Sequence, residues 1–170
     1  MENNQHLGRA KSKPLRQSHA PLEPYRAPRY RVTLVCEDAG AGSAVPVQTS
    51  AAAAALLRPC FLGLDREHFV VCGLDAKHCV TGINIVSIGS LTLSIVHPRE
   101  VFKPLILMNA AAFLCAHNHP SGDPTPSQED RLLTQRLRQG AELLGITLLD
   151  HLVIGDAGHV SFADEGWLGL

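Results

Sequence analysis

The stretch "CAHNHPSGDPTPSQED", residues 115–130, places two histidines one residue apart at the end of an apolar run, ahead of a loop that contains three prolines. If the apolar run is a strand that extends through both histidines, His117 and His119 point to one face, because side chains alternate along a strand. Asn118 then points to the opposite face. Two imidazoles on one face supply two neutral nitrogen ligands, which is the usual pair for zinc. The stretch therefore predicts a metal site at a strand end, and a polar loop without a chemical role is the alternative.

A third protein ligand, which a catalytic zinc site needs beside its open position, is available in Asp130. Seven residues of proline- and glycine-containing loop reverse the chain, and Ser127 then begins a helix whose first turn carries Asp130. A serine followed three residues later by an acidic residue is also a capping-box variant, and the two roles can coexist. The spacing H-x-H-x7-S-x2-D fixes four positions within 14 residues, which favours a metal site over coincidence.

The remaining pattern predicts an α/β fold with a mixed, largely antiparallel sheet flanked by helices. One helix should begin near Pro98, with Pro104 in its first turns or breaking it. The helix that begins at Ser127 should bury a stripe of Leu132, Leu133, Leu137, Ala141 and Leu144. A further helix is expected at 51–57, capped by Thr49 or Ser50. Strands are expected at 30–37, 67–75, 79–87, 91–96, 111–119, 146–155 and 158–164.

Composition predicts one globular domain, residues 30–170, behind a flexible, basic, proline-containing tail, residues 1–29. The chain has 170 residues, 45% of them hydrophobic, and a net charge of -1. The basic tail can contact phosphates, but the 5% aromatic content offers little for stacking bases. No secretory signal or spanning segment is evident, so we expect a cytoplasmic protein with no membrane association. The odd number of cysteines without CxxC spacing predicts buried thiols: Cys36, Cys60, Cys72, Cys79 and Cys115.

The segment "HNHPSGDPTPSQED" resembles the metalloprotease signature of the JAMM (MPN/JAB) domains, in the version found in RadC-family proteins. Further RadC-like segments are "HPREVF" at 97–102, "LGITLLDHLVIGD" at 144–156 and "SFADEGWL" at 161–168. The resemblance covers roughly residue 30 to the end. It implies a cytidine-deaminase-like sandwich and a zinc-dependent hydrolase with His117, His119 and Asp130 as metal ligands. Longer RadC proteins carry a helix-hairpin-helix region ahead of this domain, and the thirty-residue tail is too short to hold one.

The resemblance also implies a catalytic base and an oxyanion donor. Zinc lowers the pKa of its water to about 7, and a carboxylate must take the proton as that water attacks an amide or isopeptide carbonyl. JAMM domains place this glutamate at the start of a strand that follows the first helix. Glu67 fits that position, and Glu100 in "HPREVF" is the alternative. Ser127 resembles the JAMM serine that donates a hydrogen bond to the oxyanion of the tetrahedral intermediate.

These features lead to three hypotheses about function. The first is a zinc metallopeptidase that acts on a peptide or protein substrate. The second is a metal-containing, DNA-repair-associated binding module with weak or no catalysis. The third, a metal-dependent nuclease, fits less well because such enzymes commonly use two metal ions. Asp150 and His151 are adjacent in a predicted strand and face opposite ways, so a buried hydrogen-bonding role is expected for them. The edges of a small mixed sheet are also compatible with a homodimer.

Overall fold

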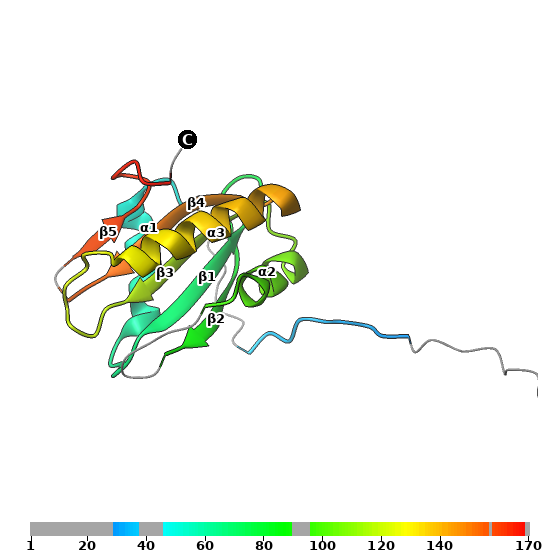
Figure 1. The fold of residues 1–170 in the computed structure, drawn as a ribbon. Helices are drawn as coiled ribbons and strands as arrows, with labels where there is room; N and C mark the ends of the chain where they lie inside the picture. The colour runs from blue at the N-terminus through cyan, green and yellow to red at the C-terminus, as the bar shows by residue number, and fades with distance from the viewer. Residues whose placement is uncertain (1–28, 38–45, 90–95, 157, 169–170) are drawn as a thin grey trace, which may run out of the picture. The chain divides into compact units, whose positions relative to one another are not determined.

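The structure is a computed structural model that describes residues 29–37, 46–89, 96–156 and 158–168. Within the described part of the unit Thr33–Leu170, five strands form one sheet. They are β1 (His68–Leu74), β2 (Val80–Ile88), β3 (Ala112–Asn118), β4 (Thr147–Ile154) and β5 (His159–Ser161). The strand order is β2-β1-β3-β4-β5 (Figure 1). Only β3 and β4 pair in parallel among these strands, so the predicted mixed, largely antiparallel sheet is confirmed.

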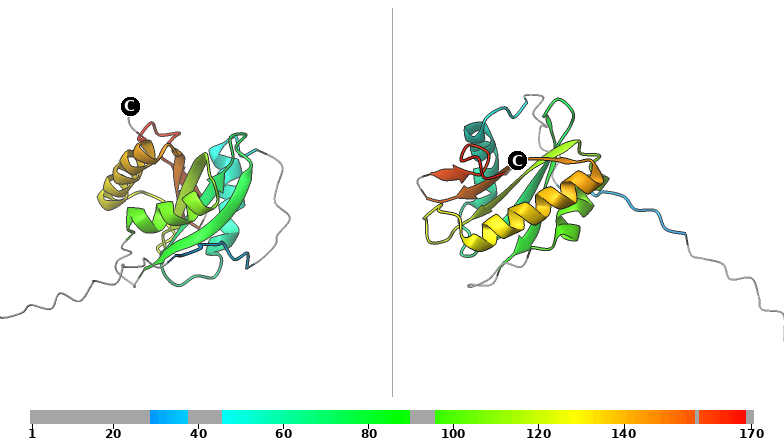
Figure 2. Two further views of the ribbon diagram at one scale, coloured as in Figure 1. Left: turned by 90° about the vertical axis from the view of Figure 1, so that its right-hand side faces the viewer. Right: turned by 45° about the horizontal axis from the view of Figure 1, so that its top comes forward.

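Helices cover both faces of the sheet (Figure 2). The helices in the described residues are α1 (Ser50–Leu57), the short 3-10 helix η1 (Arg58–Phe61), α2 (Pro98–Leu107) and α3 (Gln128–Leu144). Side chains of β1 alternate between the two layers: Val70 and Leu74 pack with α1, whereas Phe69 and Val71 pack with α2 and α3. This arrangement is the predicted α/β sandwich, and the face of α2 and α3 is the one that carries the histidine pair.

Local sequence signals account for the element boundaries that position the site. Thr49 caps α1, and its hydroxyl accepts a hydrogen bond from the backbone N–H of Ala52 at 3.1 Å. Ser127 caps α3 in a reciprocal capping box with Asp130, and Gly145 ends that helix in the left-handed conformation, with φ of 67°. The predicted capping of both helices is therefore confirmed. As a result, the backbone of the first turn of α3, which carries Asp130, is held in one conformation.

The expected strand at 30–37 is absent from the structure. These residues have no regular secondary structure, and Tyr30 and Val35 are both more than 80% exposed. A β-branched run becomes a strand only where a neighbour accepts and donates its backbone hydrogen bonds, and none of the described strands pairs with this one. The strand expected at 91–96 and the tail at 1–29 lie almost wholly outside the described residues.

Two expectations about helices also need correction. In α3 the buried residues are Thr134, Leu137 and Ala141, while Leu132 and Leu144 are about half exposed, so the buried stripe is narrower than predicted. Pro104 lies inside α2, which continues to Leu107. A proline at this position has no N–H to donate to the carbonyl four residues earlier, yet the helix continues past it and Pro104 is buried.

The cysteine prediction holds for the two residues in the central strands. Cys72 and Cys115 are buried thiols, and burial raises the pKa of Cys72 to about 12. Cys60 and Cys79 are half-buried, whereas Cys36 is exposed because the segment that carries it forms no strand.

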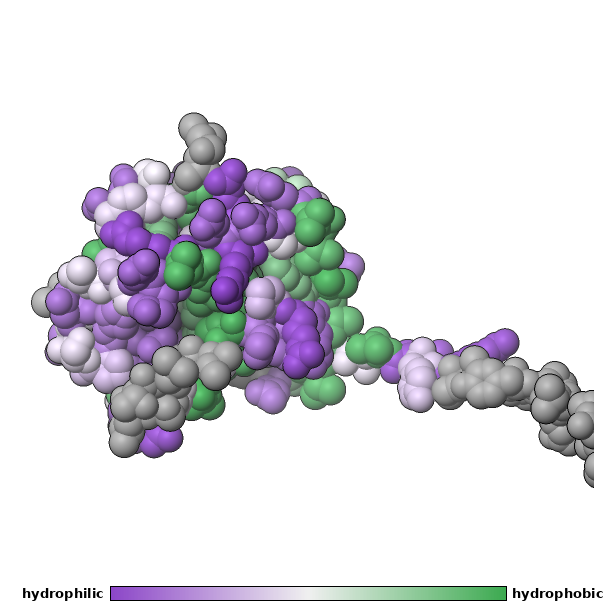
Figure 3. All heavy atoms as spheres, viewed as in Figure 1, coloured by the Kyte–Doolittle hydropathy of each residue, from purple (hydrophilic) through white to green (hydrophobic). Residues whose placement is uncertain are grey.

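No helix in the described part of the chain has the length and apolar content needed to cross a bilayer. Hydrophilic side chains cover much of the face shown in Figure 3, and hydrophobic ones gather toward its right-hand side. Exposed apolar side chains nevertheless occur on both helices of this layer, among them Ile106 of α2 and Leu143 of α3.

Candidate metal centre

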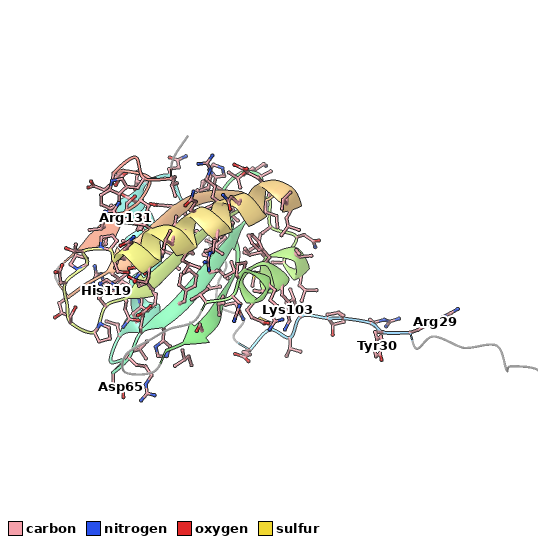
Figure 4. The ribbon with its side chains drawn as sticks, viewed as in Figure 1. Arg29, Tyr30, Asp65, Lys103, His119 and Arg131 are labelled. Atoms are coloured by element: carbon pink, nitrogen blue, oxygen red, sulfur yellow. The ribbon has the colours of Figure 1, made fainter. Side chains whose placement is uncertain are left out.

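Three of the predicted site residues meet where β3 ends and α3 begins. The Nε2 atoms of His117 and His119 lie 3.1 Å apart, and Oδ1 of Asp130 lies 3.2 Å from Nε2 of His117. Oδ2 of Asp130 lies 3.7 Å from Nε2 of His119. Figure 4 labels His119 and, in the first turn of α3, Arg131, the residue that follows Asp130. Among the described residues, this is the one group of three or more potential metal ligands that converges in this way.

The hydrogen bond on the far side of His119 determines which of its nitrogens faces the cluster with a lone pair. Nδ1 of His119 lies 2.7 Å from the backbone carbonyl oxygen of Asp123. A carbonyl oxygen can only accept, so Nδ1 carries the hydrogen and donates it. In the neutral imidazole, Nε2 therefore has a lone pair directed at His117 and Asp130, as a metal ligand requires.

A second chain of hydrogen bonds supports His117 from behind. Nδ1 of His117 lies 2.9 Å from Nε2 of His151, and Nδ1 of His151 lies 2.6 Å from the hydroxyl oxygen of Thr134. That hydroxyl donates to the backbone carbonyl of Asp130 at 2.6 Å. Burial, and then repulsion from His117, lower the pKa of His151 well below its usual value, so this imidazole is neutral. Nδ1–H of His117 therefore donates to Nε2 of His151, Nδ1–H of His151 donates to the Thr134 hydroxyl, and that hydroxyl donates to the Asp130 carbonyl. Nε2 of neutral His117 then carries a lone pair that faces the cluster.

The donor set and its spacing fit zinc. Two ligands held at about 2.0–2.1 Å on a tetrahedral ion lie about 3.3 Å apart, close to the separations of 3.1 Å between the two Nε2 atoms and 3.2 Å between Nε2 of His117 and Oδ1 of Asp130. Two imidazole nitrogens and one carboxylate oxygen are a ligand set of catalytic zinc sites. The His117 side chain is buried, whereas those of His119 and Asp130 are 19% and 13% exposed. A metal held here would keep one side open.

Asp130 serves both the helix cap and the cluster, as predicted for a coexisting role. Its Oδ2 accepts from the backbone N–H of Ser127 at 2.7 Å and from the Ser127 hydroxyl at 2.6 Å. Burial acts to raise the pKa of Asp130, but without a metal the two imidazoles can each take up a second proton and donate it from Nε2, and these hydrogen bonds from protonated His117 and His119 outweigh burial and hold the pKa of Asp130 far below its usual range. Both capping hydrogen bonds use Oδ2 and orient the carboxylate, and Oδ1 stays available as a metal ligand.

The two candidate glutamates differ in their surroundings. Glu67 lies next to the first residue of β1, and burial raises the pKa of its carboxyl against the attraction of His117. The charges of Asp130 and His119 also act on it. Glu100, in the first turn of α2, has a side chain that is 45% exposed, and it forms ion pairs with Arg99 at 3.2 Å and Lys103 at 3.8 Å. This contrast favours Glu67 as the carboxylate that acts at the cluster.

The loop between the ligands is held by close backbone packing. Gly122 has φ of 81°, and its carbonyl oxygen accepts a hydrogen bond from Asp156 at 3.1 Å. A side chain at Gly155 would collide with the carbonyl oxygen of Gly122, so only glycine allows this approach. Arg58 donates to the carbonyl of Gly155 at 2.8 Å, and so ties the turn after β4 to η1. These contacts explain why the segment contains glycines as well as prolines.

Asp150 and His151 face opposite ways, as expected. The Asp150 carboxylate accepts from the backbone N–H of Ala163 at 2.9 Å and from the Ser161 hydroxyl at 2.6 Å, and so fixes the segment after β4. That segment carries Phe162, whose ring stacks on His151 with centroids 4.9 Å apart. Sequence reasoning missed Thr134, whose signal is its position four residues after Asp130 on the same face of α3.

We expect His151→Phe to weaken zinc binding by roughly 10- to 100-fold, because removing a partner that orients a metal ligand typically costs that much. Phenylalanine keeps the ring that stacks on Phe162 but removes the acceptor for Nδ1–H of His117. Competition with a chromophoric chelator measures the affinity. His159→Phe is the matched control on the neighbouring strand β5 and should bind zinc as the wild type does. Equal affinity in both variants would show that the hydrogen bond does not orient His117.

The fold and the cluster together define a JAB-type domain with a candidate His-His-Asp metal site. Residues 47–167 match the family described as the RadC-like JAB domain. The chain is 55% identical over 105 residues to a UPF0758 protein of Bacillus licheniformis, a match that covers 62% of this chain and 47% of that relative. It is 49% identical over 114 residues to a UPF0758 protein of Methanosarcina acetivorans, covering 67% and 50% respectively. The chain therefore belongs to the RadC family, and it spans about half the length of the curated relatives it matches.

Proposed function

We propose that this protein is a zinc-dependent metallopeptidase of the JAMM type, which hydrolyses an amide or isopeptide bond in a peptide or protein substrate. The observation that carries the proposal is the convergence of two imidazole Nε2 atoms and the Asp130 carboxylate, within 4.8 Å of one another, on a site with an accessible side. The ligand set is complete, and the half-buried carboxylate of Glu67 interacts electrostatically with all three ligands. A metal-containing binding module would need the three ligands, but it would need neither an open side at the metal nor a half-buried carboxylate beside it.

His117, His119 and Asp130 would hold the ion, and when bound it would supply Lewis-acid chemistry, polarising a carbonyl and making a water acidic near neutral pH. Glu67 is the general base in this proposal: its carboxylate takes the proton of the attacking water and returns it to the leaving amine. Burial raises the pKa of Glu67, and a raised carboxyl pKa favours both halves of this transfer, since it brings the group closer to the operating pH.

Ser127 is the proposed donor to the developing oxyanion, but its hydroxyl has a competing partner. In this structure the Ser127 hydroxyl donates to Oδ2 of Asp130 and accepts from the Asp130 backbone N–H at 3.1 Å. Ser127 is exposed, so rotation about its side-chain bond can redirect the hydroxyl proton toward a substrate. The backbone N–H of Ser127 still donates to Asp130 at 2.7 Å, so the carboxylate stays oriented during that rotation.

The proposal is tested by metal analysis of the purified protein beside a peptide-library cleavage assay with and without a chelator. We expect one zinc per chain and cleavage that the chelator abolishes and added zinc restores. Bound zinc with no cleavage of any peptide or isopeptide would overturn the peptidase and favour the metal-containing binding module. Cleavage that the chelator leaves unchanged would trace to a contaminating protease and would also reject the proposal.

A further inference from the structure

The strands β1 and β3 separate at the point where the site begins. Their antiparallel ladder ends at the pair Phe69 and His117. Beyond it the chain of β3 follows β4 instead, since the backbone N–H of His119 donates to the carbonyl of Ile154 at 3.0 Å. Glu67, which immediately precedes β1, therefore lies beyond the end of the backbone ladder between β1 and β3, so this ladder does not fix its position relative to His117 and His119.

The side chain of Asn118 bridges this separation. Its amide oxygen accepts from the backbone N–H of His68 at 2.8 Å, and its NH2 group donates to the backbone carbonyl of Arg66 at 3.1 Å. Asn118 is 7% exposed and points away from the face of His117 and His119, as the alternation along the strand predicts. One buried amide therefore replaces two backbone hydrogen bonds of the interrupted ladder.

Both partners of Asn118 flank Glu67. The remaining carbonyl of this short segment, that of Glu67 itself, accepts from the backbone N–H of Gly89 at 2.8 Å. Backbone groups before, at and after the glutamate are therefore each held by a hydrogen bond. We propose that Asn118 is a positioning residue, whose amide fixes the backbone on either side of Glu67 and so holds the Glu67 carboxylate against the cluster of His117, His119 and Asp130. That Asn118 holds the backbone beside Glu67 does not depend on the proposed function. That this placement serves catalysis rests on the proposed peptidase activity.

The chemistry of asparagine suits this role better than that of similar side chains. The two flanking groups require one acceptor and one donor on a short planar side chain, and an amide supplies both. Aspartate lacks the donor and would face the Arg66 carbonyl with another oxygen. Leucine has nearly the same shape, but it leaves the His68 N–H and the Arg66 carbonyl without partners. The tripeptide of residues 117–119 thus carries two ligands and, between them, the group that holds the base.

The first test does not depend on activity. In Asn118→Leu we expect the His68 amide to exchange with deuterium at least ten-fold faster than in the wild type. The backbone order parameter of Glu67 should fall from about 0.85 toward the flexible range below about 0.6. Asn84→Leu is the matched control, because Asn84 is an exposed asparagine on the neighbouring strand β2. Unchanged values for both His68 and Glu67 in a folded Asn118→Leu protein would overturn the proposal.

If Asn118→Leu fails to fold, hydrogen exchange in the wild-type protein still tests whether the Asn118 amide is hydrogen-bonded. The side-chain NH2 of Asn118 should then exchange slowly compared with that of Asn84, and exchange as fast as that of Asn84 would overturn the proposal. Where Asn118→Leu does fold, its zinc affinity shows whether the substitution has disturbed the metal ligands as well as Glu67. It should stay within about three-fold of wild type in Asn118→Leu, because the three ligands keep their own supports.

The kinetic test separates positioning from mere stability. Misplacing a catalytic group by about 1 Å can cost on the order of 10²-fold in rate, so kcat should fall by this factor in Asn118→Leu while KM changes little. In a Glu67→Gln background, Asn118→Leu should have no further effect on kcat. An equal fall in both backgrounds would overturn the proposal. If the wild-type protein cleaves no substrate, the peptidase hypothesis is wrong. The hydrogen-exchange and order-parameter measurements would still test whether Asn118 holds the backbone beside Glu67.

Discussion

Glu67→Gln is expected to retain one zinc per chain and to lose turnover by on the order of 10²- to 10⁴-fold, the usual contribution of a general base. Glutamine has nearly the same shape as glutamate but cannot take a proton, so the backbone contacts of Arg66 and His68 with Asn118 should remain. The measurement is kcat on a cleaved peptide, with zinc content determined on the same preparation.

Glu100→Gln is the matched control, because it makes the same chemical change at the other candidate carboxylate. Glu100 is about half exposed and paired with Arg99 and Lys103, and its loss should change kcat by less than about two-fold. A large fall in Glu100→Gln together with normal turnover in Glu67→Gln would move the base to α2. Normal turnover in both variants would leave the reaction without either carboxylate and would contradict the proposed mechanism.

The convergence of His117, His119 and Asp130 could be predicted from the sequence because short-range geometry determines it. The period of a strand places His117 and His119 on one face, and a loop of seven residues followed by a helix cap returns Asp130 to them. Residues that act through tertiary contacts were less accessible. Thr134 meets His151 only because α3 packs over β4, and no local pattern encodes that crossing.

The fold shows the same division between local and long-range information. The strands β1 and β2, the largely antiparallel sheet and both helix caps follow from local sequence patterns, and these were predicted correctly. The segment at 30–37 has the composition of a strand, but a strand also needs a partner ladder, and its own composition cannot say whether one is available. Likewise, the amide of Asn118 is a simple polar side chain in the sequence. Its significance appears only where β1 and β3 diverge.

His117→Ala is expected to abolish stoichiometric zinc retention and, with it, the part of the stability that depends on zinc. A ligand present at about 100 times its Kd stabilises the folded state by about 2.7 kcal/mol, which corresponds to a Tm shift of roughly 5–15 °C for a domain of this size. A chelator should therefore lower the Tm of the wild type by that amount and leave the Tm of His117→Ala unchanged. The comparison between the two chelator responses matters more than the Tm of the variant itself, because His117 is buried and its truncation also removes packing.

His119→Ala provides a check on this point, since His119 is only partly buried and its truncation costs less packing, yet the chelator response should vanish as well. His78→Ala, at an exposed histidine in the turn after β1, should respond to the chelator as the wild type does. If His117→Ala and His119→Ala both kept the full chelator-dependent shift, the zinc that stabilises the protein would lie elsewhere, and the assignment of the metal ligands would be wrong.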